Sequence, residues 1–283
     1  MTDSRLKDPA LAALFAARDA GALAYWQEAT GGSAAPDAAI ERALARDILA
    51  HRGDYPAALL RQHRGPMLAR AASTVRAMGQ GGAAGPGDSL VELQQTDHAF
   101  RGFFGVEVLT LRHRRYDGTM SLPLRREVFV SVDAVTVLPY DPVQDLVLMV
   151  EQFRAAPVAR GGGRVWQLEA VAGRIDAGET PEETARREAA EEAGVQLDRL
   201  LPVASYYPSP GAVTEYLYSF VALTRLDPGQ AGLHGLAEEG EDIRTLVEPF
   251  TTAIGRVAAG EITNAPLIMS LLWLERERAA LRG

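Results

Sequence analysis

The 283-residue sequence contains no cysteine, and this absence removes three kinds of chemistry. Disulfide bonds, thiolate nucleophiles and zinc sites with thiolate ligands all require that side chain. Folding must therefore depend on packing, and a hydrophobic share of 47% is ordinary for a globular chain with a sizeable core. The length allows one large domain, or one domain with a small accessory region.

Long apolar runs and an excess of basic residues are also missing. No stretch reaches the roughly 18 apolar residues of a membrane-spanning helix, so no transmembrane segment is predicted. The first apolar segment is short and interrupted by Arg18 and Asp19, which does not fit a secretory signal. The net charge is -8, from 29 basic and 37 acidic residues, which argues against nucleic acid or anionic membrane as a partner. We therefore expect a cytoplasmic protein.

The first part of the chain has a helical pattern. Residues 1–78 carry apolar positions at helical spacing, for example Leu44 and Ile48. Residues 79–88 are rich in glycine and lack apolar periodicity, which is typical of a linker. We expect a helical N-terminal extension with its linker over residues 1–88.

Short strands dominate the rest of the chain. Asp117-Gly118 is a hairpin signal between two of them. The expected strands are 103–113, 119–122, 129–138, 146–152, 166–171, 204–207 and 216–223. Helical patterns occur at 181–193 and about 266–281. We expect an α+β sandwich over 89–283, with N-terminal strands in 89–130 and the main domain in 131–283.

The segment GRIDAGETPEETARREAAEEAGV contains a helix with clear end signals. Thr180 can cap its N-terminus, and Pro181 suits the first turn. Glu183 completes a capping box with Thr180. Gly194 is a natural C-terminal stop.

Three carboxylates share one face of this predicted helix. Glu188 and Glu192 are four residues apart, and Glu191 lies beside them. Like charges at this spacing cost roughly 0.2–0.5 kcal/mol per pair. A bound cation would offset that cost, and Mg²⁺ prefers such hard oxygen ligands together with substrate phosphates.

A simpler interpretation is a solvated helix stabilised by ion pairs. The pairs Glu182 with Arg186, Glu183 with Arg187, and Arg187 with Glu191 all have the required spacing. Spacing alone favours neither interpretation over the other.

The complete string distinguishes them, because it resembles the Nudix box at each fixed position. The matching residues are Gly173, Glu179, Arg187, Glu188, Glu191, Glu192 and Gly194, followed by an aliphatic residue. Ala189 is smaller than the aliphatic residue usual at its position. So many fixed positions over 23 residues make a far more specific signal than a lone glycine motif.

The resemblance extends over about residues 97–281 and is to the ADP-ribose pyrophosphatase branch of the Nudix hydrolases. AFRGFFGVEV, SLPLRREVF, LMVEQFR, WQLEAVAGRID, SPG and HGLAEEGEDIR follow in the order typical of that branch. Pro210 stands 15 residues after Val195, the spacing that marks the ADP-ribose members, although Ser209-Pro210-Gly211 is also an ordinary turn. The resemblance implies a Nudix α/β/α sandwich with an N-terminal antiparallel sheet swapped between the subunits of a homodimer.

By this resemblance the carboxylate cluster is a metal site for Mg²⁺, with Mn²⁺ as a substitute. Glu188 and Glu192 would be the main ligands, Glu191 would assist, and the carbonyl of Ala172 would complete the site. Arg187 would orient Glu179.

The implied reaction is the attack of water on one phosphorus of ADP-ribose, giving AMP and ribose 5-phosphate. The base comes from an acidic loop after the box, where Glu239 and Glu241 are the candidates. The alternative for these two residues is an acidic surface turn.

The resemblance also assigns substrate contacts. Arg154 and either Arg125 or Arg126 match positions that bind phosphate or ribose, which suits the guanidinium fork. Each could equally be a surface arginine.

Aromatic and interface residues follow from the same comparison. Phe103, or its neighbour Phe104, could stack on adenine, although an aromatic beside a strand is more often part of the core. Arg101, Phe103 and Arg125 are candidates for contacts across the dimer interface.

Two other functions remain open from the sequence. Hydrolysis of another nucleotide sugar such as GDP-mannose would use the same metal site. A sensor that binds ADP-ribose without cleaving it would usually have lost box glutamates or gained a DNA-binding module, and neither is seen. The role of residues 1–88 stays open, either as a docking or oligomerisation element or as a remnant of another domain.

Overall fold

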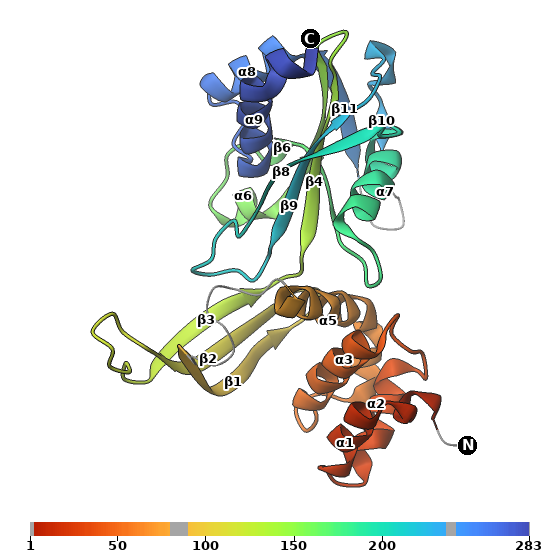
Figure 1. Cartoon of the computed structure of the whole chain (residues 1–283), viewed down its shortest axis with the longest axis vertical. Coiled ribbons are helices and arrows are strands. Elements are labelled where there is room, and N and C mark those ends of the chain that lie inside the picture. Colours follow the sequence, from red (N-terminus) through yellow and green to blue (C-terminus); the bar gives the residue numbers. More distant parts are fainter. Residues whose placement is uncertain (1–2, 80–89, 236–241, 283) are drawn as a thin grey trace. The chain divides into compact units, whose positions relative to one another are not determined.

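A computed structural model describes residues 3–79, 90–235 and 242–282 of the protein. The chain forms two compact units (Figure 1). The first unit comprises Met1–Asp133, Asp176–Gly178 and Ser209–Glu215. The second comprises Ala134–Ile175, Glu179–Pro208 and Tyr216–Gly283.

The first unit begins with short helices, as the sequence predicted for residues 1–78. The helices are η1 (Ser4–Lys7), α1 (Pro9–Ala16), α2 (Gly21–Thr30), α3 (Ala38–Ala50), α4 (Ala57–Gln62) and α5 (Arg64–Gly79). Asp8 and Asp37 cap α1 and α3 by accepting backbone N–H bonds. The apolar faces of these helices enclose a core of their own around Trp26, Leu44 and Ile48.

A three-stranded antiparallel sheet completes the first unit. Its strands are β1 (Val91–Arg101), β2 (Gly105–His113) and β3 (Leu124–Val130), in that order. The strand expected at 119–122 is wrong, because only an isolated bridge joins Arg114 to Met120 and β3 begins at Leu124. The N-terminal antiparallel sheet itself is confirmed.

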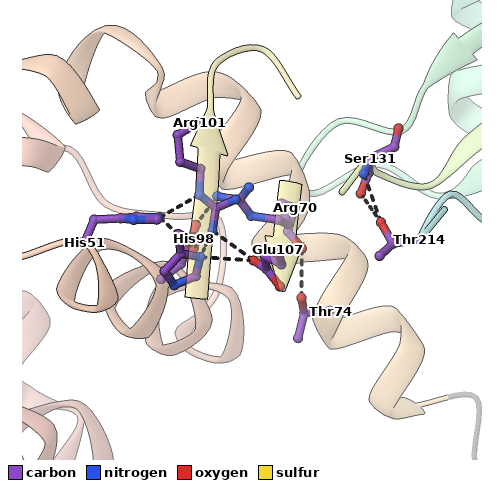
Figure 2. A network of polar contacts seen from close by, with 9 residues as sticks. His51, Arg70, Thr74, His98, Arg101, Glu107, Ser131 and Thr214 are labelled. Carbon is purple, nitrogen blue, oxygen red and sulfur yellow. Dashed lines mark hydrogen bonds and ion pairs between the residues drawn. The ribbon is translucent and has the colours of Figure 1, made fainter. Parts of the chain in front are cut away.

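The strand expected at 129–138 is interrupted between Val130 and Ala134. Ser131 exchanges two hydrogen bonds with Thr214, at 2.9 and 2.8 Å (Figure 2). The backbone N–H of Asp133 donates to Ser73 Oγ at 2.9 Å, and the Asp133 carboxylate accepts from Arg76 Nε at 2.7 Å. These bonds pair polar backbone groups of the segment without a neighbouring strand, and the expected strand is divided there into β3 and β4.

The second unit is built on an eight-stranded sheet. Its strands are β4 (Ala134–Asp141), β5 (Leu146–Phe153), β6 (Trp166–Glu169), β7 (Val171–Arg174), β8 (Arg199–Tyr206), β9 (Leu217–Leu223), β10 (Leu233–His234) and β11 (Ile243–Pro249). The main order is β10-β11-β5-β4-β9-β8, with β6 paired to β5 and β7 to β4. The helices of this unit are α6 (Ala155–Ala159), α7 (Pro181–Ala193), η2 (Pro228–Gln230), α8 (Phe250–Ala258) and α9 (Ala265–Arg282).

The sheet is covered on both faces. Leu148 and Val150 point to a cluster with the apolar side of α7, whereas Val147 and Met149 point to a cluster with α8 and α9. Figure 1 shows α7 on one side of the sheet and α8 and α9 on the other. This arrangement confirms the predicted sandwich. Among the described helices, none is both long and apolar enough to cross a lipid bilayer.

Candidate functional site

The glutamate-rich helix α7 has the ends that its sequence predicts. Thr180 Oγ1 accepts from the N–H of Glu183 at 3.2 Å, and the Glu183 carboxylate accepts from the N–H of Thr180 at 2.8 Å. Gly194 adopts the left-handed conformation, with φ of 62°, after the last turn. Both ends are therefore fixed, and the side chains between them project in defined directions.

Two glutamates of α7 lie directly on strand β7. A Cβ atom at Gly173 would fall 1.8 Å from Glu188 Oε1, so only glycine leaves room for that carboxylate. Glu192 is buried, and its Oε2 accepts from the N–H of Ala172 at 3.1 Å. Strand and helix thus bring together Ala172, Glu188 and Glu192.

Arg187 joins three carboxylates. Its Nε and Nη2 donate to Glu179 at 2.9 and 3.1 Å, and its Nη1 donates to Glu188 at 2.8 Å and to Glu191 at 3.0 Å. The hydrogen bonds to Glu179, with the charge of Glu188, raise the pKa of Arg187 above its ordinary value. The contact with Glu179 and the helix pair with Glu191 therefore coexist.

The donor set of this cluster fits a hard divalent cation. Carboxylate oxygens of Glu188, Glu191 and Glu192 emerge from one face of α7, beside the backbone of β7. Within the described ranges, however, no group of three or more acidic or histidine side chains already surrounds a common point. Arg187 occupies oxygens of Glu188 and Glu191. A metal ion must compete with this guanidinium for the same oxygens.

Arg154 lies beside strands β5 and β6 in the same unit. Its Nε and Nη2 donate to the two oxygens of Glu169 at 3.0 and 2.8 Å. The Arg154 side chain is 43% exposed, whereas that of Glu169 is 7% exposed. Glu169 therefore fixes the direction of a guanidinium that still reaches solvent.

Arg101 of β1 is buried in the first unit (Figure 2). Its Nε donates to His51 Nε2 at 2.8 Å, and its Nη2 contacts His98 Nδ1 at 3.0 Å, Glu107 at 3.0 Å and Asp47 at 3.3 Å. Because arginine only donates, His51 Nε2 and His98 Nδ1 must both accept, so neither of these two nitrogens carries a proton. Burial, followed by the charge of Arg101, lowers the pKa of His51, against the opposing effect of the nearby Asp47 carboxylate.

The other predicted binding residues of the first unit are exposed. Phe103 is 58% exposed and lies edge-on to Phe104, with ring centroids 4.9 Å apart. Arg125 and Arg126 project from β3 into solvent. Pro210 lies in a turn in which the carbonyl of Ser209 accepts from Ala212 and Val213.

Glu239 and Glu241 lie outside the described residues. The strands that precede and follow them in the sequence are β10 and β11. A side chain at Gly194 would contact His234 Cε1 at 3.5 Å, so the end of β10 lies beside the C-terminus of α7.

Sequence reasoning missed several side chains that hold the predicted ones. Glu169 orients Arg154, and His51 and Glu107 hold Arg101. A signal for Glu169 did exist, because an acidic residue within the apolar run of β6 and β7 needs a cationic partner when buried. His51 had no comparable local signal.

Comparison with known proteins adds to this geometry. The Nudix domain model matches residues 130–259. ADP-ribose pyrophosphatase of Escherichia coli K12 is 41% identical over 198 residues, which cover 70% of this chain and 93% of that protein. The chain belongs to the Nudix family. The resemblance inferred from its sequence is therefore confirmed.

Two further relatives and one solved structure are also similar to the chain. ADP-ribose pyrophosphatase of Haemophilus influenzae is 35% identical, over 68% of this chain and 89% of that protein. GDP-mannose pyrophosphatase of Yersinia pestis is 34% identical, over 65% of this chain and 91% of that protein. The crystal structure of an ADP compounds hydrolase superposes with a TM-score of 0.53 at 18% identity, covering 68% of this chain and 97% of that one. This likeness supports the Nudix fold.

Proposed function

We propose that this Nudix protein hydrolyses the diphosphate of ADP-ribose, giving AMP and ribose 5-phosphate. The observation that carries the proposal is the 41% identity over nearly the full length of the Escherichia coli ADP-ribose pyrophosphatase. The convergence of Glu179, Arg187, Glu188 and Glu192 beside β7 supports a hydrolytic site.

Nudix hydrolases generally use divalent metal ions, and we propose Mg²⁺ here, with Mn²⁺ as a substitute. Glu188, Glu192 and Glu191 would hold the ion, together with the carbonyl of Ala172. Such an ion neutralises phosphate oxygens and lowers the pKa of bound water. Glu179 supports the site by drawing Arg187 toward itself through two hydrogen bonds.

Glu239 or Glu241 would take the proton of the attacking water. Both follow β10, whose His234 lies near the end of α7. The pair of carboxylates provides a base whose removal should lower turnover without loss of metal binding.

Arg154, with Arg125 or Arg126, would bind phosphate and ribose oxygens. Arg154 is supported by Glu169, which leaves nearly half of its side chain exposed. Phe103 is exposed enough to stack on adenine. Pro210 would shape the turn that marks ADP-ribose members of the family.

A homodimer is the assembly that we propose. Strands β1 to β3 and their connections expose large apolar side chains, which is unusual for a surface without a partner. These side chains are Val91, Leu93, Phe100, Phe103, Phe104, Leu122 and Phe129. Phe103 and Arg125 would contact the partner subunit from exposed positions, whereas Arg101 would first have to leave His51.

We assign residues 1–88 to a helical extension with its linker, and 89–283 to the hydrolase region with its N-terminal strands in 89–130. The net charge of -8 supports a protein that binds neither nucleic acid nor anionic membrane. We assign its action to the cytoplasm.

The second candidate is GDP-mannose hydrolysis, which the 34% identity to the Yersinia pestis enzyme favours. Product analysis with ADP-ribose, GDP-mannose and NADH under one metal condition separates the two. We expect AMP and ribose 5-phosphate from ADP-ribose at a kcat/KM at least about tenfold above the other substrates. Comparable rates on GDP-mannose would reject the substrate assignment, and binding of ADP-ribose without turnover would indicate a sensor.

A further inference from the structure

Three tyrosines form a continuous row of rings in the second unit. Tyr207 and Tyr216 have ring centroids 4.8 Å apart at 75°, and Tyr216 and Tyr218 have centroids 5.3 Å apart at 74°. Tyr207, at the outer end, is 50% exposed, whereas the other two are half-buried. The row therefore presents one accessible ring that its neighbours hold in place by edge-to-face packing.

Strand register places this row on the same face of the sheet as the carboxylate cluster. Val135 of β4 pairs with Gly173 of β7 on one side and with Tyr218 of β9 on the other. Tyr218 packs against the cluster that includes the apolar side of α7. Glu188 covers Gly173 on this same face.

The same register gives the separation. Gly173 and Tyr218 are two strand spacings apart, so their Cα atoms are about 10 Å from each other. The row then continues away from Glu188, from Tyr218 through Tyr216 to Tyr207. It starts near the proposed diphosphate site and ends at an exposed ring.

This arrangement matches the layout of a nucleotide. A ribose separates the phosphate from the base, so a surface for the base belongs one sugar length beyond the phosphate site. An exposed aromatic ring held by its neighbours is the usual partner for a nucleobase, because every base has a flat π face.

We infer that Tyr207, supported by Tyr216 and Tyr218, is a stacking surface for the nucleobase of the substrate. The inference rests on the proposed function, because it takes the diphosphate to lie at Glu188 and Glu192. It concerns a surface of the second unit alone and is tested independently of the role proposed for Phe103.

The products of the reaction separate base binding from sugar binding. AMP carries the base and ribose 5-phosphate does not, so their inhibition constants in ADP-ribose hydrolysis are measured for Tyr207→Ala and Tyr207→Phe. We expect Tyr207→Ala to raise the inhibition constant of AMP about 5- to 20-fold and to leave that of ribose 5-phosphate unchanged. Tyr207→Phe keeps the ring and should retain AMP binding. In Tyr207→Ala, KM should rise and kcat should change little.

The adjacent Tyr206 provides a matched control. Its hydroxyl bonds to Ser219 Oγ at 3.2 Å on the opposite face of the sheet. Tyr206→Phe should therefore leave the AMP constant unchanged. An equal rise for AMP and ribose 5-phosphate in Tyr207→Ala, a rise for ribose 5-phosphate alone, or no rise for AMP would each overturn the inference.

Calorimetric titration of AMP separates this inference from the proposed function. If the unaltered protein binds AMP and Tyr207→Ala weakens that binding, the stacking surface stands even where ADP-ribose is not hydrolysed. If ADP-ribose is hydrolysed but AMP binds both proteins equally, only the stacking surface is rejected. Failure of the unaltered protein to bind AMP would overturn the inference.

Discussion

The carboxylate of Glu188 occupies the space over Gly173 where any other residue would place its Cβ atom. A helix side chain and a strand backbone are thus in direct contact at the centre of the proposed metal site. The lack of a side chain at one position fixes where a ligand from another element can lie.

Gly173→Ala should displace Glu188 and impair turnover. The added methyl group would lie 1.8 Å from Glu188 Oε1 and 2.0 Å from Cδ, so the carboxylate must move. We expect kcat to fall by about a hundredfold, as a displacement near 1 Å commonly does. Gly255→Ala on α8 is the control, because nothing lies within 4 Å of its added atom. Equal activity of the two variants would contradict the proposed position of Glu188.

Glu192→Gln should abolish most turnover while the fold persists. The amide oxygen can still accept from the N–H of Ala172, but the charge that would bind the cation is lost. We expect kcat to fall at least about a hundredfold, with an unchanged circular dichroism spectrum. Glu182→Gln, exposed in the first turn of the same helix, should retain activity. Unchanged turnover in Glu192→Gln would reject the metal assignment.

Mg²⁺ should stabilise the protein, and Glu188→Gln should remove that effect. A ligand that binds only the folded state adds about 2.7 kcal/mol at a concentration of one hundred times its Kd. The melting temperature measured with Mg²⁺ and with EDTA reports binding without any need for turnover. The control is again Glu182→Gln, which should keep the shift. An equal shift in Glu188→Gln would place the ion elsewhere.

The free energy of unfolding should fall as the pH drops below about 6.5, in part because of His51. The pKa of His51 is lowered in the folded state, so the unfolded chain binds the additional proton first. The contribution of His51 to the free energy of unfolding is therefore fully present above the pKa that this side chain has in the unfolded chain. It is lost as the pH falls below that pKa. Asp47, with a pKa of about 2, remains charged throughout this window.

Urea unfolding between about pH 5 and 7 tests this effect in His51→Gln. Glutamine can accept from Arg101 without titrating, so the slope of stability against pH should become shallower. His113→Gln, on the exposed end of β2, should keep the slope of the unaltered protein. An identical slope in all three proteins would exclude His51 as the titrating group.

Local signals predicted some parts of the fold well. Helix α7 spans Pro181–Ala193 as expected, because its cap, first-turn proline and terminal glycine are close in sequence. Strand β1 was missed because Val91–Arg101 is largely polar and exposed, so alternation of apolar residues is weak. Helix α8 was missed because Phe250–Ala258 contains several β-branched residues, whose helix propensity is low. The helix packs against the sheet.

In the candidate site, too, the residues with a local sequence signal could be predicted and those without one could not. Glu188, Glu191 and Glu192 could be grouped from the sequence because helical spacing alone places them on one face. The partners of Arg154 and Arg101 could not, because Glu169 and His51 are 15 and 50 residues away in the chain. Such contacts depend on tertiary structure, for which the sequence has no local signal.

The link between Arg76 and Asp133 matters for any shortened form of the protein. Burial raises the pKa of Asp133, and Arg76 on α5 is the cation that compensates its charge. Expression from residue 89 onward would delete both Arg76 and Ser73. The Asp133 carboxylate would then lose its ion-pair partner and its hydroxyl partner. Deletion of the helices therefore also disturbs the residue that immediately precedes strand β4. A truncated protein should carry Asp133→Asn, so that loss of the helices is not confounded with an unpaired carboxylate.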